Sequence, residues 1–325
     1  MGKGLIRAVR LGNLKHVKEL LLKSVNPNYT DGEGKTALYW ACNYKYLDMV
    51  QLLFSDCVKG VPTNPNIADN EGKTPLREAL RGTALEIVQC LLLNGANPNI
   101  IDNKGITLLY STCFDGYLDG VKELLASGAN PNTENTTGET PLYAASYYGH
   151  IDCVKDLLAA GANPNHADKE GQTPLHWVSR LGRRHIAREL LSHGADPNIL
   201  DVQNKSPLFW ASHMGKRGIV KDLLLFNAYI DTKSIHGKTA LFQAAYQGYT
   251  KIVKILLANG ADPTIIDAHG HTPLYWSMKL GYLDIPDLLM NATFTYFPTL
   301  KNISMRCIRN HEININKIPQ VTFSS

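Results

Sequence analysis

The chain has 325 residues, of which 44% are hydrophobic and 19% are charged, and this composition indicates a globular protein and excludes a disordered one. Its formal net charge of +4 is too small to predict nucleic-acid binding. A membrane-spanning helix is not expected either, because no run approaches the roughly 18 apolar residues that such a helix needs.

The six cysteines indicate a reducing compartment. They form no C-x-x-C pair and no Cys/His cluster with zinc spacing, so we expect no metal site and no cofactor. The first residues lack the long apolar core of a secretory signal. We therefore expect a cytoplasmic or nuclear protein whose cysteines are small buried hydrophobic residues.

Taken in chain order, the sequence repeats one unit nine times. The first unit, residues 5–28, lacks the opening turn of the others. The other eight open on a threonine or serine that leucine follows two residues later: Thr36, Thr74, Thr107, Thr140, Thr173, Ser206, Thr239 and Thr272. The spacing is 38 residues between the first two and 33 thereafter. A fixed period of this length is typical of stacked supersecondary units.

The unit that opens at Thr140 predicts a pair of helices. The Thr140 hydroxyl can cap a helix whose first position is Pro141. Gly149 ends that helix, and residues 151–158 have the apolar spacing of a second one. Gly161 follows as a C-terminal cap.

Some units depart from this pattern. Lys45 and Thr83 stand at the position of the glycine between the helices, so we expect less regular turns there. Extra residues around 57–62 predict a bulge after the second helix of the second unit. Pro286 must lie near the start of the last second helix.

The 33-residue period, the T-P-L-[HY] motif and the G-A-[ND]-P-N loop resemble the ankyrin repeat over residues 1–295. The resemblance implies an all-α solenoid of about nine helix-turn-helix repeats, each with a projecting β-hairpin finger. We therefore expect two regions, a solenoid over residues 1–296 and a short helical segment over 297–325.

The sequence offers little to catalysis, and we expect no enzyme. By the resemblance, His176 binds the backbone of the neighbouring repeat. His269 and His271 lie in one finger, but no further ligand completes a metal set. One acidic position recurs in the fingers and is explained by turn hydrogen bonding: Asp31, Asp69, Asp102, Asp168, Asp201 and Asp267.

What remains is a surface for a protein partner. In ankyrin stacks the partner lies on the concave face, which the fingers and the exposed ends of the first helices form. The candidate residues lie seven or eight positions after each repeat's opening residue: Tyr44, Arg81, Phe114, Tyr147, Tyr148, Arg180, His213, Met214 and Tyr246. These residue types often anchor interfaces. The alternative is that the aromatic residues only cover helix ends.

The four tryptophans favour packing between repeats over a ligand site. All of them occupy the same repeat position, four residues after the opening residue: Trp40, Trp177, Trp210 and Trp276. Such periodicity is expected of a contact that every pair of neighbouring repeats makes.

The last segment carries an apolar stripe of helical spacing, and Pro298 can start the helix. The stripe consists of Leu300, Ile303, Ser304, Cys307 and Ile308. Together with Ile318-Pro319, it is similar to the elongin-binding box of ankyrin-and-SOCS-box proteins. That resemblance implies a substrate-recognition adaptor, with Leu300, Ile303, Ser304 and Ile308 binding elongin B/C and a cullin as a further partner. The alternative is a non-catalytic scaffold whose tail caps the last repeat.

Overall fold

The computed structural model describes residues 2–55 and 60–296. The described residues form two compact units, which divide between Asp168 and Lys169. The helices of the first unit are α1 Gly2–Arg10, α2 Leu14–Leu22, α3 Ala37–Asn43, α4 Leu47–Phe54, α5 Pro75–Arg81, α6 Leu85–Leu93, α7 Leu108–Asp115, α8 Leu118–Ala126, α9 Pro141–Tyr148 and α10 Ile151–Ala159. Those described in the second unit are α11 Pro174–Leu181, α12 Arg184–Ser192, α13 Pro207–His213, α14 Arg217–Leu225, α15 Ala240–Tyr246, α16 Thr250–Ala258, α17 Pro273–Lys279 and α18 Asp284–Tyr296.

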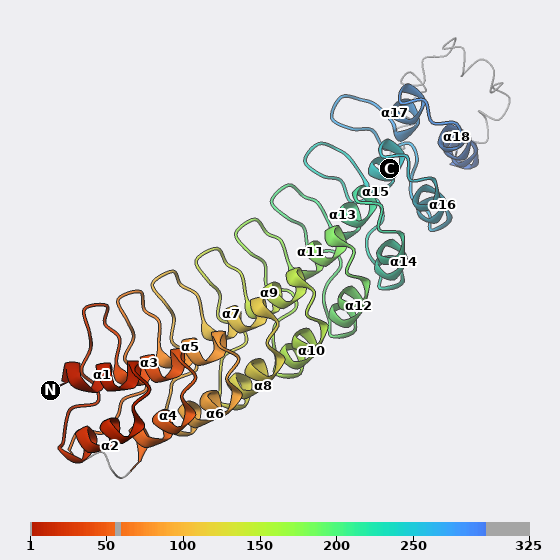
Figure 1. Ribbon diagram of the computed structural model, residues 1–325. Coiled ribbons are helices and arrows are strands. Elements are labelled where there is room, and N and C mark those ends of the chain that lie inside the picture. The colour runs from red at the N-terminus through yellow and green to blue at the C-terminus, as the bar shows by residue number, and fades with distance from the viewer. Residues whose placement is uncertain (1, 56–59, 297–325) are drawn as a thin grey trace, which may run out of the picture. The chain divides into compact units, whose positions relative to one another are not determined.

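Within each unit the helices form two rows. The first helices of successive repeats lie side by side, as α3 does against α5 and α7 against α9, and the second helices form the other row. Figure 1 shows the fingers as loops that project from the row of first helices. The predicted all-α repeat architecture is therefore confirmed.

The fingers are tight turns and not the expected β-hairpins. In the part of the chain that the structure describes there is no strand, and two isolated bridges are recorded, Thr30 with Thr36 and Ile101 with Thr107. The side chain at the acidic finger position holds each turn instead. Asp69 Oδ1, for example, accepts hydrogen bonds from the backbone N–H groups of Glu71 and Lys73 at 3.0 and 2.9 Å. One carboxylate thus satisfies two N–H groups that a longer ladder would otherwise pair.

The opening threonine sets the start of each first helix. Thr36 Oγ1 accepts a hydrogen bond from the Tyr39 N–H at 3.1 Å, and Thr107 Oγ1 does the same for Tyr110 at 3.0 Å. Leucines and small residues such as Leu142 and Ala144 are fully buried behind these caps. The small side chains allow neighbouring first helices to pack closely.

A second asparagine in each N-P-N loop joins one repeat to the next. Asn99 Oδ1 accepts from the Asn130 N–H at 2.8 Å, and its amide group donates to the Gly128 carbonyl at 2.9 Å. Asn66 and Asn132 make the same pair of bonds with the repeats that follow them. The contact survives the insertion in the second repeat, since Asn28 binds the Asn64 N–H and the Pro62 carbonyl.

Lys45 and Thr83 do not loosen their turns, contrary to the expectation from the sequence. Both adopt the left-handed conformation that glycine has in other repeats, with φ of 60° and 52° against 71° at Gly116. A residue with a Cβ atom is strained in that conformation, most of all a β-branched one. The packing of the repeats therefore holds the turn, and the two side chains cost stability.

We predict that Thr83→Gly raises the free energy of unfolding by about 0.5–1 kcal/mol, because it removes Cβ strain and loses part of the gain to backbone entropy. Thr83→Ala is the matched control, since it deletes the branch but keeps Cβ. Chemical denaturation of the two variants measures the difference. A glycine variant no more stable than the alanine variant would show that the turn is not strained.

Candidate functional site

The nine candidate residues lie at the C-terminal ends of first helices. In the first unit they occupy the ends of α3, α5, α7 and α9, and in the second unit those of α11, α13 and α15. The two units are described separately below, because the candidates do not have the same surroundings in both.

Three candidates of the first unit form one aromatic cluster, which we define as Phe114, Tyr147 and Tyr148. The Phe114 and Tyr148 ring centroids are 4.2 Å apart, and those of Tyr147 and Tyr148 are 5.0 Å apart. Phe114 is 43% exposed and Tyr148 41% exposed. Rings that already contact one another and still face solvent can bind a partner with little loss of side-chain entropy.

Tyr44 belongs to a second group, separated from the aromatic cluster along the chain by the repeat that contains Arg81. Its ring stacks on Trp40 of the same repeat, with centroids 5.8 Å apart. The guanidinium of Arg10, in the preceding repeat, lies 4.6 Å from the centroid of the Trp40 ring. Arg81 is held by Glu78, whose Oε2 accepts from its guanidinium at 3.0 Å. The Arg81 side chain is nevertheless 70% exposed.

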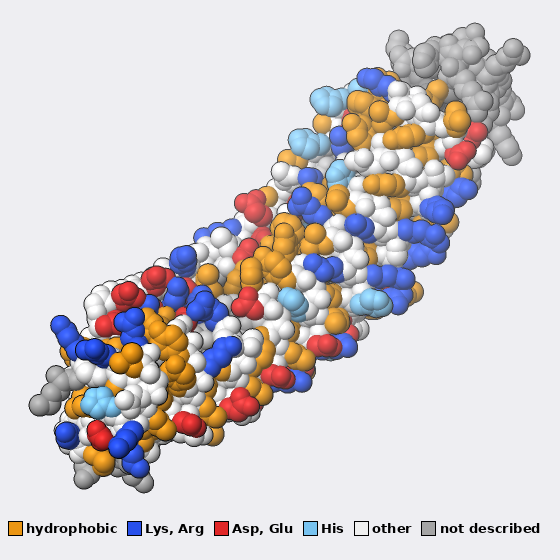
Figure 2. Space-filling model, viewed as in Figure 1, with side chains coloured by type: hydrophobic (Ala, Val, Ile, Leu, Met, Phe, Trp, Pro, Cys, Tyr) orange, Lys and Arg blue, Asp and Glu red, His pale blue; other side chains and the backbone are white. Residues whose placement is uncertain are grey.

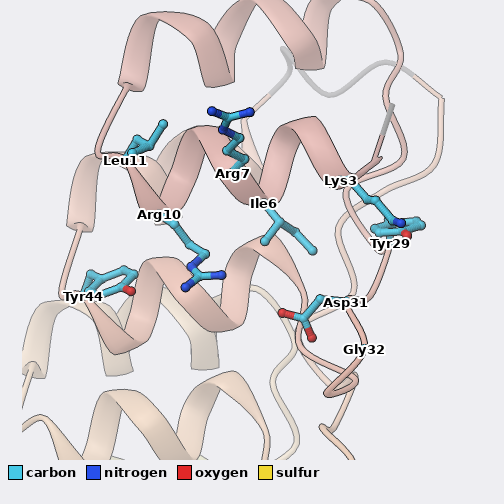
Figure 3. Close-up of a pocket in the computed structure, with 9 residues that line it drawn as sticks. All are labelled: Lys3, Ile6, Arg7, Arg10, Leu11, Tyr29, Asp31, Gly32 and Tyr44. Atoms are coloured by element: carbon cyan, nitrogen blue, oxygen red, sulfur yellow. The ribbon is translucent and has the colours of Figure 1, made fainter.

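Beside this second group the surface is hollowed between α1 and the first finger (Figure 3). Lys3, Arg7 and Arg10 line the hollow, with Tyr29 and Asp31 opposite. Figure 3 shows Arg7 and Arg10 pointing away from each other, and Lys3 beside Tyr29. The cations do not converge on one point, so the hollow suits an extended contact and not a single small anion.

The candidates of the second unit are more deeply set. His213 stacks on Phe209, and its Nδ1 lies 3.0 Å from Oε1 of Gln243 in the next repeat. Tyr246 stacks on Phe242 and meets the edge of Trp276, so both His213 and Tyr246 are half-buried in contacts between repeats. Met214 is 39% exposed. The sequence did not distinguish these internal contacts from exposed ones.

Three tryptophans contact the preceding repeat, as expected: Trp40 through Arg10, Trp210 through Arg180 and Trp276 through Tyr246. They also have a second role that the sequence did not predict. Trp40, Trp210 and Trp276 are half-buried, and each donates its Nε1–H to the aspartate of its own finger at 2.9–3.1 Å. Each indole thus fixes the angle between a finger and the first helix. The signal was available as the spacing of nine residues between Asp31 and Trp40, which recurs in three later repeats.

This architecture agrees with the comparison to known families. A model of three tandem ankyrin repeats matches residues 5–102, 81–168, 153–234 and 208–299. The chain belongs to the ankyrin-repeat family. Ankyrin repeats are protein-binding scaffolds, so a protein-binding surface is the kind of site to seek in this chain.

Curated relatives match a short part of the chain. Osteoclast-stimulating factor 1 of Bos taurus, of Rattus norvegicus and of Mus musculus is 44% identical over 48 residues. The match covers 15% of this chain and 22% of each relative. The shared part is therefore little longer than one ankyrin repeat, and it carries no information on the partner.

The described side chains show neither a metal site nor a reactive buried thiol. In the described part of the chain no three His, Cys, Asp or Glu residues gather to hold a metal ion, and none of its helices is long and apolar enough to cross a membrane. Cys42 and Cys113 are buried, and burial raises the pKa of both thiols, which makes them poor nucleophiles. Cys57, Cys307 and the predicted elongin-binding residues Leu300, Ile303, Ser304 and Ile308 lie outside the described residues.

His176 is a structural histidine in the ankyrin stack. Its Nδ1 accepts from the Thr173 N–H at 3.1 Å, and its Nε2–H donates to the Lys205 carbonyl of the next repeat at 3.1 Å. The side chain is 1% exposed. Burial is the main cause that lowers the pKa of His176 to about 4.

The low pKa of His176 predicts a loss of stability in acid. In the unfolded chain a histidine titrates near pH 6.5, so between about pH 6.5 and pH 4 the unfolded state binds the extra proton. The contribution of neutral His176 to the free energy of unfolding is complete above that window. It falls as the pH drops through the window, by about 3 kcal/mol in the acid limit. The unfolding free energy of wild type and His176→Gln, measured from pH 7 to pH 4, checks this. The variant should be less stable at pH 7 and show a shallower slope; equal slopes would contradict the assignment.

Proposed function

We propose that this ankyrin-repeat chain is a non-catalytic adaptor that binds a protein through the finger side of its first helices, in the cytoplasm or nucleus. The observation that carries the proposal is the aromatic cluster Phe114, Tyr147 and Tyr148, where two large rings are in contact and about two-fifths exposed. Exposed large aromatic side chains in contact are uncommon on a surface that binds nothing, and residues of this type dominate interface energies.

The surroundings of the cluster support the same function. Tyr44 is 38% exposed on the same side of the helix row, and Arg81 reaches solvent between them in the sequence of repeats. Arginine and tyrosine are the residue types most often found at the centre of interfaces. The small pocket beside α1 adds three cations at the edge of this surface.

Replacement of the cluster should abolish partner binding without unfolding the chain. We expect the double variant Phe114→Ser with Tyr148→Ser to lose the proteins that surround the wild type in cells, by about tenfold or more in labelling yield. Quantitative proximity labelling measures the loss. Leu93→Ser is the matched control, because Leu93 is 87% exposed at the end of the second helix α6, away from the first-helix row. Equal labelling by all three proteins would contradict the proposal.

We also propose a finer role, that the adaptor presents its partner to an elongin–cullin ubiquitin ligase through residues 299–319. Support comes from the sequence, in which Leu300, Ile303, Ser304 and Ile308 have the spacing of the elongin-binding box directly after the repeats. The alternative role of this segment is to cap the apolar side of the last repeat, because terminal repeats of a stack need a cover.

Co-purification with elongin B/C separates the two roles of the last segment. The adaptor role predicts a complex that Leu300→Asp destroys, since a carboxylate replaces the apolar side chain at the centre of the contact. The capping role predicts no complex and a lower melting temperature after deletion of residues 297–325. Failure to bind elongin B/C would overturn the ligase role and leave the protein-binding function of the repeats intact.

A further inference from the structure

Lysines at the base of the fingers are neutralised in the first unit and not in the second. In the first unit Lys35 pairs with Glu33 at 2.6 Å, and Lys73 pairs with Glu71 in the same way. At the position of these glutamates stand the neutral Gln203, which binds Lys205, and His236, two residues before Lys238. Within the described residues no carboxylate lies within ion-pair distance of Lys205 or Lys238.

Aromatic rings lie against Lys205, Lys238 and two further cations of the second unit. We name this set the cationic row and define it as Arg180, Lys205, Lys238 and Lys279. Trp210 lies under two of them, with Arg180 4.9 Å and Lys205 4.6 Å from its ring centroid. Tyr246 lies 5.5 Å from the Lys238 ammonium and contacts Trp276, which is 4.8 Å from the Lys279 ammonium.

The rings favour this position of the charges. A cation over an aromatic face gains electrostatic energy, and its aliphatic stem covers the ring while the charged group stays at the surface. The side chains are thus already ordered before a partner arrives, and binding costs less entropy.

The two aspartates below the row are buried and already hydrogen-bonded. Asp201 and Asp267 are each 4% exposed. Each accepts hydrogen bonds from two backbone N–H groups of its finger and from the Nε1–H of a tryptophan. In the repeat between them Ser234 replaces the aspartate. A partner that approaches this face therefore meets the cations of the row before it meets these two carboxylates.

The second helices of the second unit add to the positive field. In the first unit α4, α6, α8 and α10 have an acidic residue in the first turn and α2 has none. In the second unit α12, α14 and α16 have none, and α18 has Asp284 and Asp287. Figure 2 shows lysine and arginine gathered on one side of the second unit. The exposed cations of α14 and α16 are Arg217, Lys221, Lys251 and Lys254. Such a field raises the rate at which an acidic ligand is captured.

We propose that the cationic row binds an extended acidic segment of the partner protein, with a carboxylate at about every third residue. Lys205 and Lys238 occupy the same position in successive repeats. Packed helices lie roughly 8–10 Å apart, so these two cations are expected to recur at about that distance. A polyproline II segment advances about 3.1 Å per residue and returns to the same face every third residue, about 9 Å on. This inference rests on the proposed protein-binding function and names the chemistry of the ligand in the second unit.

A peptide with glutamate at every third position, spaced by proline and serine and labelled at its N-terminus, tests the spacing on the full chain. Fluorescence anisotropy at low salt should show binding on the order of tenfold tighter than for a peptide of equal composition with adjacent glutamates. Equal affinity for the two peptides would overturn the spacing. Affinity for oligodeoxythymidine equal to that for the spaced peptide would overturn a protein ligand.

A variant that keeps every cation tests the row itself. Gln203→Glu with His236→Glu introduces the glutamates that neutralise Lys35 and Lys73 in the first unit, and we expect binding to weaken on the order of tenfold. Lys205→Gln with Lys238→Gln should give the same loss of affinity. The circular dichroism spectra of both double variants should match that of the wild type. The control Lys233→Gln removes a cation outside the row from the same unit and should bind like the wild type. A loss as large in the control would show that net charge alone attracts the peptide.

The aromatic-cluster variant of the first unit separates this inference from the function on which it rests. It should bind the spaced peptide like the wild type. If no protein binds the wild type by any cluster-dependent route, the proposed function fails whatever the peptide does. If cluster-dependent partners are found and the spaced peptide does not bind, only the cationic row is refuted.

Discussion

The amide of the second asparagine in each N-P-N loop fixes the distance between one repeat and the next. Its oxygen accepts from a backbone N–H of the following loop and its nitrogen donates to a backbone carbonyl there, as at Asn99. One side chain therefore satisfies a donor and an acceptor in the same neighbouring loop, which restricts both separation and register. On the finger side, bonds such as Ile235 N–H to the Gln203 carbonyl repeat the same restriction. Side chains at one repeat position are consequently placed at regular intervals.

Because the intervals are regular, the backbone of the repeats is constant and the binding surface differs only in its side chains. Backbone hydrogen bonds and small buried residues stabilise the stack of repeats. Its stability does not depend on which side chain stands seven or eight positions after the opening threonine. The first unit places aromatic rings there, at Phe114 and Tyr148, and the second unit places Arg180 and Lys279. The chemistry of the two units can differ for this reason while their helices remain alike.

The period, the helix pairs and the caps could be predicted because each depends on residues close in sequence. Thr140, Gly149 and Gly161 each act within a few residues of their own position, and the sequence shows them directly. The surface could be predicted only in part. Tyr148 and Phe114 are exposed as expected, but His213 and Tyr246 are half-buried, because their contacts with Gln243 and Trp276 lie one repeat away. The turns at Lys45 and Thr83 were also not predictable, since packing between repeats overrides the local preference of these residues.

The loss of acidic partners in the second unit illustrates why a binding surface can change without a cost to the fold. The Lys35 ion pair joins an exposed glutamate to a half-buried lysine, and ion pairs that water reaches contribute about 0–1 kcal/mol. A glutamine at the equivalent position, Gln203, therefore costs little stability. Lys205 keeps its place because its ammonium group lies over the rings of Phe209 and Trp210. Buried charges behave differently. The Asp222 side chain is 5% exposed and binds Arg184 and Arg188 of the preceding repeat. Removal of its carboxylate would leave both guanidinium groups without this partner. A charge that only shapes the surface can thus be exchanged at little cost to stability, whereas removal of a buried charge that connects two repeats is expected to cost more.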